Sequence, residues 1–172
     1  MASKDKIWLF ILGSIIGFVG LLMFYIDETL AMWQLEGYFS TQYYMNIFGV
    51  VFQDGSEFAN FGEEGGTVVY AAIIVIVGLA LLILAGLQGS KAIGLIAIVA
   101  FLGGLAYYYY SFVQFYYDNE LLFGFFGGMG SVEGFQILWG NNDPVSWRLG
   151  NGFFIVFGGA IVSLIGLFRS RY

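Results

Sequence analysis

The most informative stretch of the chain lies at residues 67–117 and reads TVVYAAIIVIVGLALLILAGLQGSKAIGLIAIVAFLGGLAYYYYSFVQFYY. Two runs without any charged residue, 67–87 and 92–117, flank a turn at residues 88–91. Each run is long enough to cross the hydrocarbon core of a bilayer, since a spanning helix needs about 20 apolar residues. So short a connection places the two helices side by side and antiparallel. The stretch therefore predicts a transmembrane helical hairpin.

Two further runs of the same kind lie near the ends of the chain, at residues 7–26 and 152–168. All four runs are continuously apolar, whereas the strands of a membrane barrel alternate between apolar and polar residues. A helix also satisfies its backbone polar groups internally, as lipid requires. The expected fold class is an all-α transmembrane four-helix bundle, with residues 1–172 forming a single membrane domain.

The composition of the 172-residue chain supports this class, because 59% of its residues are hydrophobic and only 10% are charged. The absence of cysteine and histidine excludes disulfides, thiolate and imidazole metal ligands, and Ser–His chemistry. No charged residue lies inside the four runs, which disfavours proton relays and ion-coupled transport. We therefore expect no catalytic residue, no metal, no cofactor and no small-molecule substrate.

The basic residues predict the orientation, because short cytoplasmic segments of membrane proteins collect Lys and Arg. Five of the six bases fall on the side of the 88–91 turn and the two termini. We therefore expect a multi-pass protein of the plasma membrane with both termini in the cytoplasm and extracellular loops at 27–66 and 118–151. Eleven of the twelve acids then lie outside, where their negative field disfavours nucleic acid as a partner. The five bases are Lys4, Lys6, Lys91, Arg169 and Arg171.

Both long loops show signs of folded structure. Residues 39–47 approximate the alternation of a half-buried strand, and a second strand is expected at 50–52, ended by a turn at 54–56. A helix over 39–47 remains an alternative, because aromatic and aliphatic residues also recur there every four positions. In the second loop a strand is expected at 135–139, followed by a turn at 141–144. Together the loops predict a small extracellular β-containing cap.

Small residues spaced four apart mark the expected helix contacts, since close backbone approach drives helix packing in lipid. We interpret these residues as packing sites inside one bundle rather than as a dimerisation face. They are Gly13 and Gly17 in the first run, Ala100 and Gly104 in the third, and Gly159 and Ser163 in the fourth, with Gly103 and Gly158 widening the last two small faces.

A glycine-rich but strongly apolar segment lies within the second loop at residues 123–130. A solvated loop would not normally expose so many large apolar side chains, so this segment is expected to pack on the sheet, dip into the headgroup layer or meet a partner. The candidate residues for protein contact are Trp33 and Phe48 in the first loop and Phe123, Phe125, Phe126, Met129 and Trp139 in the second.

The layout resembles the claudin-like tetraspan superfamily. The shared features are four spans with both ends inside, a larger first external loop, a short inner turn, and Trp33 followed by the aromatic–glycine pair Phe48-Gly49. The sequence departs from the family pattern where Gly49 is followed by Val50, and the family's cysteine pair is absent. The resemblance implies a left-handed four-helix bundle with a small sheet from both loops, in proteins that assemble laterally or act as accessory subunits.

These features lead us to expect a non-enzymatic tetraspan membrane protein whose extracellular loops mediate lateral self-assembly or contact with another protein. Its expected partners are membrane lipids and either further copies of itself or another membrane protein. An accessory subunit that stabilises a larger membrane complex is the alternative, and a passive pore or small-solute carrier is a second alternative.

Overall fold

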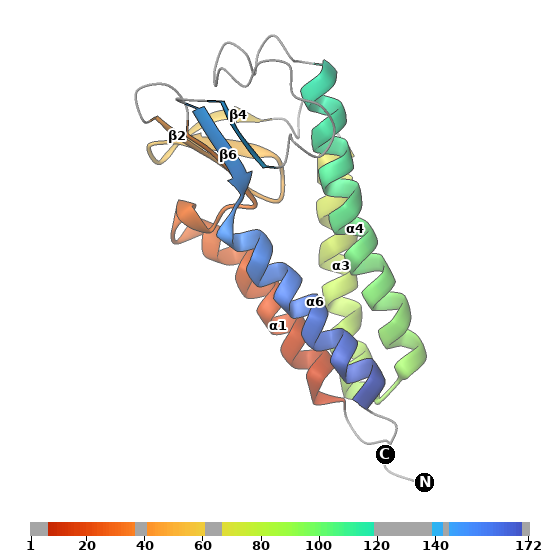
Figure 1. Cartoon of the computed structure of the whole chain (residues 1–172). Coiled ribbons are helices and arrows are strands. Elements are labelled where there is room, and N and C mark those ends of the chain that lie inside the picture. Colours follow the sequence, from red (N-terminus) through yellow and green to blue (C-terminus); the bar gives the residue numbers. More distant parts are fainter. Residues whose placement is uncertain (1–6, 37–40, 61–66, 119–138, 143–144, 170–172) are drawn as a thin grey trace, which may run out of the picture.

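The computed structural model describes residues 7–36, 41–60, 67–118, 139–142 and 145–169. Within these ranges the chain is mostly helical, with four long apolar helices and one antiparallel sheet. Figure 1 shows the helices gathered at the end that carries both termini and the sheet at the opposite end. The predicted combination of four long helices and a small sheet is confirmed.

The four helices follow the four predicted runs, and each is long and apolar enough to cross a membrane. In the first run the α-helix ends at Leu22 and is followed by a short 3₁₀ helix, η1 (Met23–Tyr25). A second 3₁₀ helix, η2 (Glu28–Leu30), comes just after the run. The long helices are α1 (Trp8–Leu22), α3 (Thr67–Gln88), α4 (Lys91–Asp118) and α6 (Asn151–Arg169).

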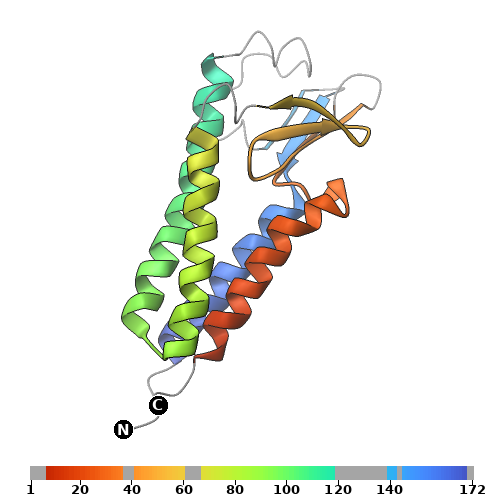
Figure 2. The ribbon, with the colours of Figure 1, turned by 180° about the vertical axis from the view of Figure 1, so that it is seen from behind.

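The helices form two pairs, α1 with α6 and α3 with α4, which diverge toward the sheet (Figures 1 and 2). At the narrow end the Ile7 amide donates to the Gly86 carbonyl at 3.0 Å, which joins α1 to α3. Higher along the same two helices, the Ser14 hydroxyl donates to the Leu79 carbonyl at 2.7 Å. Ser163, by contrast, bonds the Gly159 carbonyl of its own helix. One buried serine therefore links the pairs directly.

The closest helix contacts are made at glycines. A Cβ added to Gly13 would lie 2.5 Å from the Gly159 carbonyl oxygen, so α1 and α6 meet backbone to backbone. In the other pair, a Cβ on Gly104 would lie 2.9 Å from the Val75 nitrogen. Gly17 faces the Leu79 side chain instead, because α3 crosses α1 at that level.

Two of the predicted packing glycines are not at helix contacts. A Cβ on Gly103 or on Gly158 would meet no atom within 4 Å in the described part of the chain. The prediction for these two is wrong because each precedes a glycine that does face a neighbouring helix, and one residue rotates a helix by about 100°. Conversely, Gly78 contacts the backbone of Phe101, a site that the spacing argument missed.

The sheet has the order β4-β3-β2-β1-β6-β5, with every neighbouring pair antiparallel. Pairing of β1 with β6 joins strands from the two long connections, as predicted. The strands are β1 (Trp33–Glu36), β2 (Gln42–Met45), β3 (Val50–Gln53), β4 (Ser56–Asn60), β5 (Gly140–Asn142) and β6 (Val145–Leu149).

The predicted strands are partly confirmed. β2 and β3 occupy the predicted segments, and the helical alternative is wrong for residues 42–45. Asp54 and Gly55 have φ of 50° and 79°, as a two-residue type I′ hairpin turn requires, but Ser56 already begins β4.

The second loop differs more from its prediction. The turn expected at 141–144 is wrong in its first half, because Asn141 and Asn142 belong to β5 and pair with β6. Most of the strand expected at 135–139 lies outside the described residues, and Trp139 immediately precedes β5. Strands β1, β4, β5 and β6 were not predicted.

Buried tyrosines of α4 fasten the sheet to the helices. The Tyr108 hydroxyl donates to the Asn46 carbonyl at 2.7 Å, and the Tyr109 hydroxyl donates to the Met32 carbonyl at 3.1 Å. The Asn46 side chain in turn accepts from the amides of Phe48 and Val50, which fixes the turn between β2 and β3. The sheet is therefore held at two points by one helix.

Replacing Tyr108 by phenylalanine is expected to lower the free energy of unfolding by about 1 kcal/mol, because the Asn46 carbonyl loses its hydrogen bond from α4 and keeps only the one from the Gly49 amide. Tyr110→Phe is the matched control, since the Tyr110 side chain is exposed on the same helix. Thermal unfolding in detergent measures the stability of both purified variants. Equal stability of Y108F and Y110F would show that the hydrogen bond does not hold the sheet.

Candidate functional site

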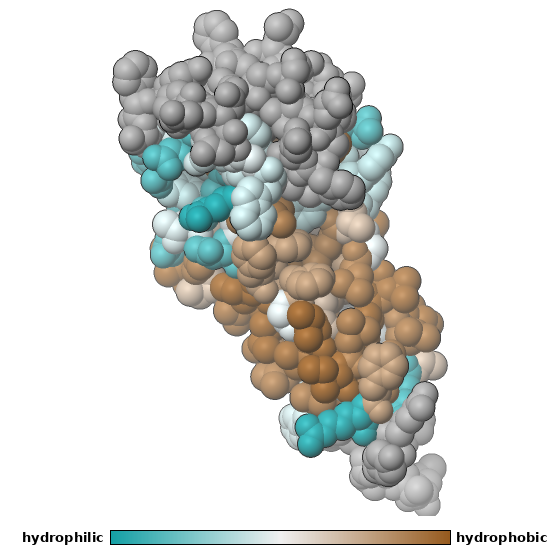
Figure 3. Space-filling model, in the orientation of Figure 1, coloured by the Kyte–Doolittle hydropathy of each residue, from teal (hydrophilic) through white to brown (hydrophobic). Residues whose placement is uncertain are grey.

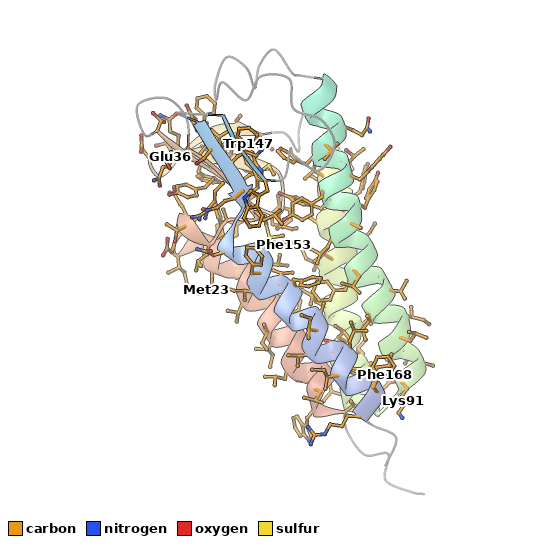
Figure 4. All side chains as sticks on the ribbon, viewed as in Figure 1. Met23, Glu36, Lys91, Trp147, Phe153 and Phe168 are labelled. Carbon is orange, nitrogen blue, oxygen red and sulfur yellow. The ribbon has the colours of Figure 1, made fainter. Side chains whose placement is uncertain are left out.

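The sheet has one apolar and one polar face. Along β1, Trp33 and Leu35 are buried, while Gln34 is half-buried and Glu36 exposed. β6 repeats this alternation next to it, with Trp147 buried and Arg148 exposed. Figure 4 shows Trp147 on the side of α3 and α4, and Glu36 on the side turned away from them.

The strand register assembles two polar rows on the outer face. Gln34 of β1 lies between Tyr44 of β2 and Arg148 of β6. In the next row Glu36 lies between Gln42 and Ser146. Side chains directly opposite in an antiparallel pair are close enough to interact, so these six form one continuous surface.

A hollow of about 300 Å³ lies over this surface. Thr29 of η2 and Asn151 at the start of α6 line it on the side of the α1–α6 pair, and we call these two residues its floor. In Figure 3 hydrophilic residues on this side directly adjoin the apolar surface of the helices. The hollow is lined by Thr29, Gln34, Leu35, Glu36, Gln42, Tyr44, Ser146, Arg148 and Asn151.

Hydrogen bonds fix the orientation of several lining side chains. The Gln34 amide donates to the Thr29 carbonyl at 2.5 Å, and the Asn151 amide donates to the same oxygen at 3.4 Å. The Gln34 side-chain oxygen accepts from Arg148 Nε at 3.4 Å. The Tyr44 hydroxyl donates to the Gln42 side-chain oxygen. These hydrogen bonds hold the polar side chains that line the hollow in fixed orientations before any ligand binds.

The charges around the hollow are of mixed sign. Burial raises the pKa of the Tyr44 phenol, the charges of Glu28, Asp27 and Glu36 raise it further, and Arg148 lowers it. Within the described part of the chain, the long bond to Gln34 is the hydrogen bond that Arg148 makes. A guanidinium has five N–H donors, so this one bond leaves most of the donor capacity of a residue that lines the hollow for a ligand.

Three of the candidate contact residues from the sequence are described, Trp33, Phe48 and Trp139, and none of them lines the hollow. The prediction that Trp33 is available for protein contact is wrong, because its side chain is 2% exposed and packs on Phe112 with ring centroids 5.1 Å apart. Phe48 is half-buried against the core. Trp139 is 68% exposed beside β5. Phe123, Phe125, Phe126 and Met129 lie outside the described residues.

The residues of the hollow were missed although a pattern marks them. Both WQLE at 33–36 and VSWRL at 145–149 alternate apolar and polar residues, which indicates a half-buried strand. Each segment is short, and pairing between them joins residues more than a hundred positions apart.

No protein-family model, curated protein or solved structure matches the chain.

Proposed function

We propose that this chain is a non-enzymatic, multi-pass protein of the plasma membrane with a layout like that of the claudin-like tetraspans. In this proposal the four helices span the bilayer, both termini are cytoplasmic, and the sheet forms an extracellular cap that mediates lateral self-assembly. The membrane placement is supported by large apolar side chains exposed on all four long helices, including Leu12, Ile73, Val99 and Ile161. Such side chains are stable in lipid and unfavourable in water.

The observation that carries the self-assembly proposal is the pair of sheet edges. Within the described residues, β4 and β5 each pair on one side only. An unpaired strand edge is a template for pairing with another chain. An exposed aromatic residue accompanies each edge, Phe58 in β4 at 40% exposure and Trp139 before β5. Both edges therefore offer backbone groups together with apolar surface.

The direction of the edge strands suits an assembly of parallel copies. Because neighbouring strands alternate in direction across the six-stranded sheet, β4 and β5 run in opposite directions. A second copy displaced along the sheet would bring its β4 antiparallel to the β5 of the first. Displacement without rotation also keeps both copies the same way up in the bilayer, so this head-to-tail contact would build rows within the membrane plane.

The interior of the bundle does not favour the alternative of a passive pore. Phe10, Leu79, Leu82 and Phe101 are fully buried at the meeting of the two helix pairs, where they leave an apolar, filled interior. The accessory-subunit alternative uses the same edges, with a strand of another protein in place of the second copy.

Cross-linking tests the proposed edge contact, and the cysteine-free chain makes single cysteines unambiguous. We expect that co-expressed W139C and F58C chains, treated in their native membrane with a short bis-maleimide, give a dimer of about twice 19.0 kDa. The control pairs W139C with Tyr70→Cys, which is exposed on α3 and belongs to neither edge strand.

Two outcomes would contradict self-assembly through the edges. Dimers that form equally well with Y70C would indicate random collision in the membrane. If W139C and F58C cross-link only to a different, larger protein, this result would contradict self-assembly and support the accessory-subunit alternative.

A further inference from the structure

The hollow on the outer face of the sheet presents one positive and one negative side chain. Arg148 and Glu36 lie on the same face of neighbouring strands, with Glu36 opposite Ser146, two residues from Arg148. Both side chains are exposed and both line the hollow. The arrangement therefore offers separate positions for an anionic and a cationic group of one ligand.

Neutral polar groups complete each position. Asn151 lies beside Arg148 at the start of α6, where the helix dipole also favours an anion. Gln42 lies opposite Glu36 and accepts from the Tyr44 hydroxyl, and the acids near Tyr44, Glu36 among them, favour a cation there. A guanidinium with a neighbouring amide suits a phosphate, and a carboxylate among oxygen acceptors suits an ammonium group.

The place of the hollow relative to the apolar surface narrows the class of ligand. Ile26, which follows η1, is 79% exposed, and Tyr25 and Phe154 are exposed close in sequence to the floor residues Thr29 and Asn151. A ligand headgroup in the hollow could thus leave attached acyl chains beside the outer ends of α1 and α6. Figure 3 shows this direct passage from hydrophilic to apolar surface.

We infer that the hollow binds the zwitterionic headgroup of a phospholipid, with the phosphate on Arg148 and the ammonium group on Glu36. This inference rests on the proposed membrane placement, which puts the hollow at the headgroup level of the outer leaflet. The bound lipid would fill the space between the sheet and the α1–α6 pair and stabilise the cap against the membrane.

Native mass spectrometry of the full chain in detergent tests the site, with phosphatidylethanolamine and phosphatidylglycerol added in equal amounts. Phosphatidylglycerol has no ammonium group to pair with Glu36, and one charge-assisted hydrogen bond corresponds to about a tenfold change in affinity. We therefore expect one phosphatidylethanolamine to bind about tenfold more tightly than phosphatidylglycerol. Arg148→Gln should weaken binding of both lipids about tenfold. Glu36→Gln should remove the preference for phosphatidylethanolamine.

The matched controls are Arg169→Gln, at the opposite end of α6, and Glu57→Gln, on β4 outside the hollow. Both should bind as the unchanged chain does. Should R148Q fail to fold, Arg148→Lys serves instead, because it keeps the charge but loses the planar fork of donors and should still weaken phosphate binding.

Equal binding of the two lipids by the unchanged chain, or no effect of R148Q and E36Q beyond that of the controls, would overturn the inference. Free phosphoethanolamine binding as tightly as short-chain phosphatidylethanolamine would overturn the assignment to a membrane lipid. If W139C and F58C still cross-link in these cases, the headgroup site alone is wrong and the self-assembly proposal stands.

Discussion

Alanine in place of Gly159 is expected to lower the free energy of unfolding by about 3 kcal/mol, the upper part of the range for overpacking a close contact. The new Cβ would fall on the Gly13 carbonyl oxygen and lie 2.8 Å from the Gly17 nitrogen. These are backbone atoms of α1, so no rotamer change can relieve the overlap. The two helices must separate along their whole contact, which also removes dispersion energy between their side chains.

Gly158, the residue before Gly159, provides the control. Gly158→Ala adds the same methyl group to the same helix at a position with no atom within 4 Å among the described residues. Its stability should equal or slightly exceed that of the unchanged chain, since alanine favours a helix by about 0.5–1 kcal/mol over glycine. Thermal or denaturant unfolding in detergent measures the difference. Equal destabilisation by both variants would mean that α1 and α6 do not touch at Gly159.

Trp33→Ala is expected to lower the free energy of unfolding by about 4 kcal/mol, as for other large buried side chains. Trp33 is almost completely buried, and its ring contacts Phe112 of α4 while its strand pairs with both β2 and β6. The substitution therefore opens a cavity at the point where the sheet rests on the helices. We expect the sheet to loosen before the helices, which limited proteolysis of the purified chain should detect as earlier cleavage in β1–β4.

Trp139→Ala is the matched control for Trp33, because it removes the same ring from an exposed position. Surface substitutions usually change stability by no more than about 0.5 kcal/mol. A similar loss of stability in W33A and W139A would contradict the placement of Trp33 in the core. Earlier cleavage in the helices than in the sheet would contradict the proposed order of loosening.

The helices could be predicted from sequence because an uninterrupted apolar run has few other stable solutions. Which side of each helix faces its neighbours could not be predicted. The helices are apolar all round, so no amphipathic pattern distinguishes Gly103 from Gly104 or Gly158 from Gly159. The spacing of four residues identified Gly104 and Gly159, which face a neighbouring helix, whereas Gly103 and Gly158, added because they lie next to these glycines, do not.

The sheet and its hollow were harder to predict for a different reason. The strands are three to five residues long, and the hollow depends on the pairing of β1 with β6. Gln34 and Arg148, which are hydrogen-bonded, stand 114 residues apart in the chain. Local patterns specify which residues point outward, but a single sequence does not specify which strands become neighbours. Trp33 was assigned to contact with partners because the alternation around it was not recognised as a strand.

The most direct test of the account is the accessibility of the α3–α4 turn and of the sheet from outside the cell. Gln88→Cys and Ser56→Cys each add one exposed thiol to the cysteine-free chain, the first at the turn between α3 and α4, the second in the sheet. With a membrane-impermeant maleimide on intact cells, we expect S56C to be labelled and Q88C to be labelled only after permeabilisation. Labelling of Q88C in intact cells, or of neither residue until the membrane is opened, would contradict an extracellular cap on four spanning helices.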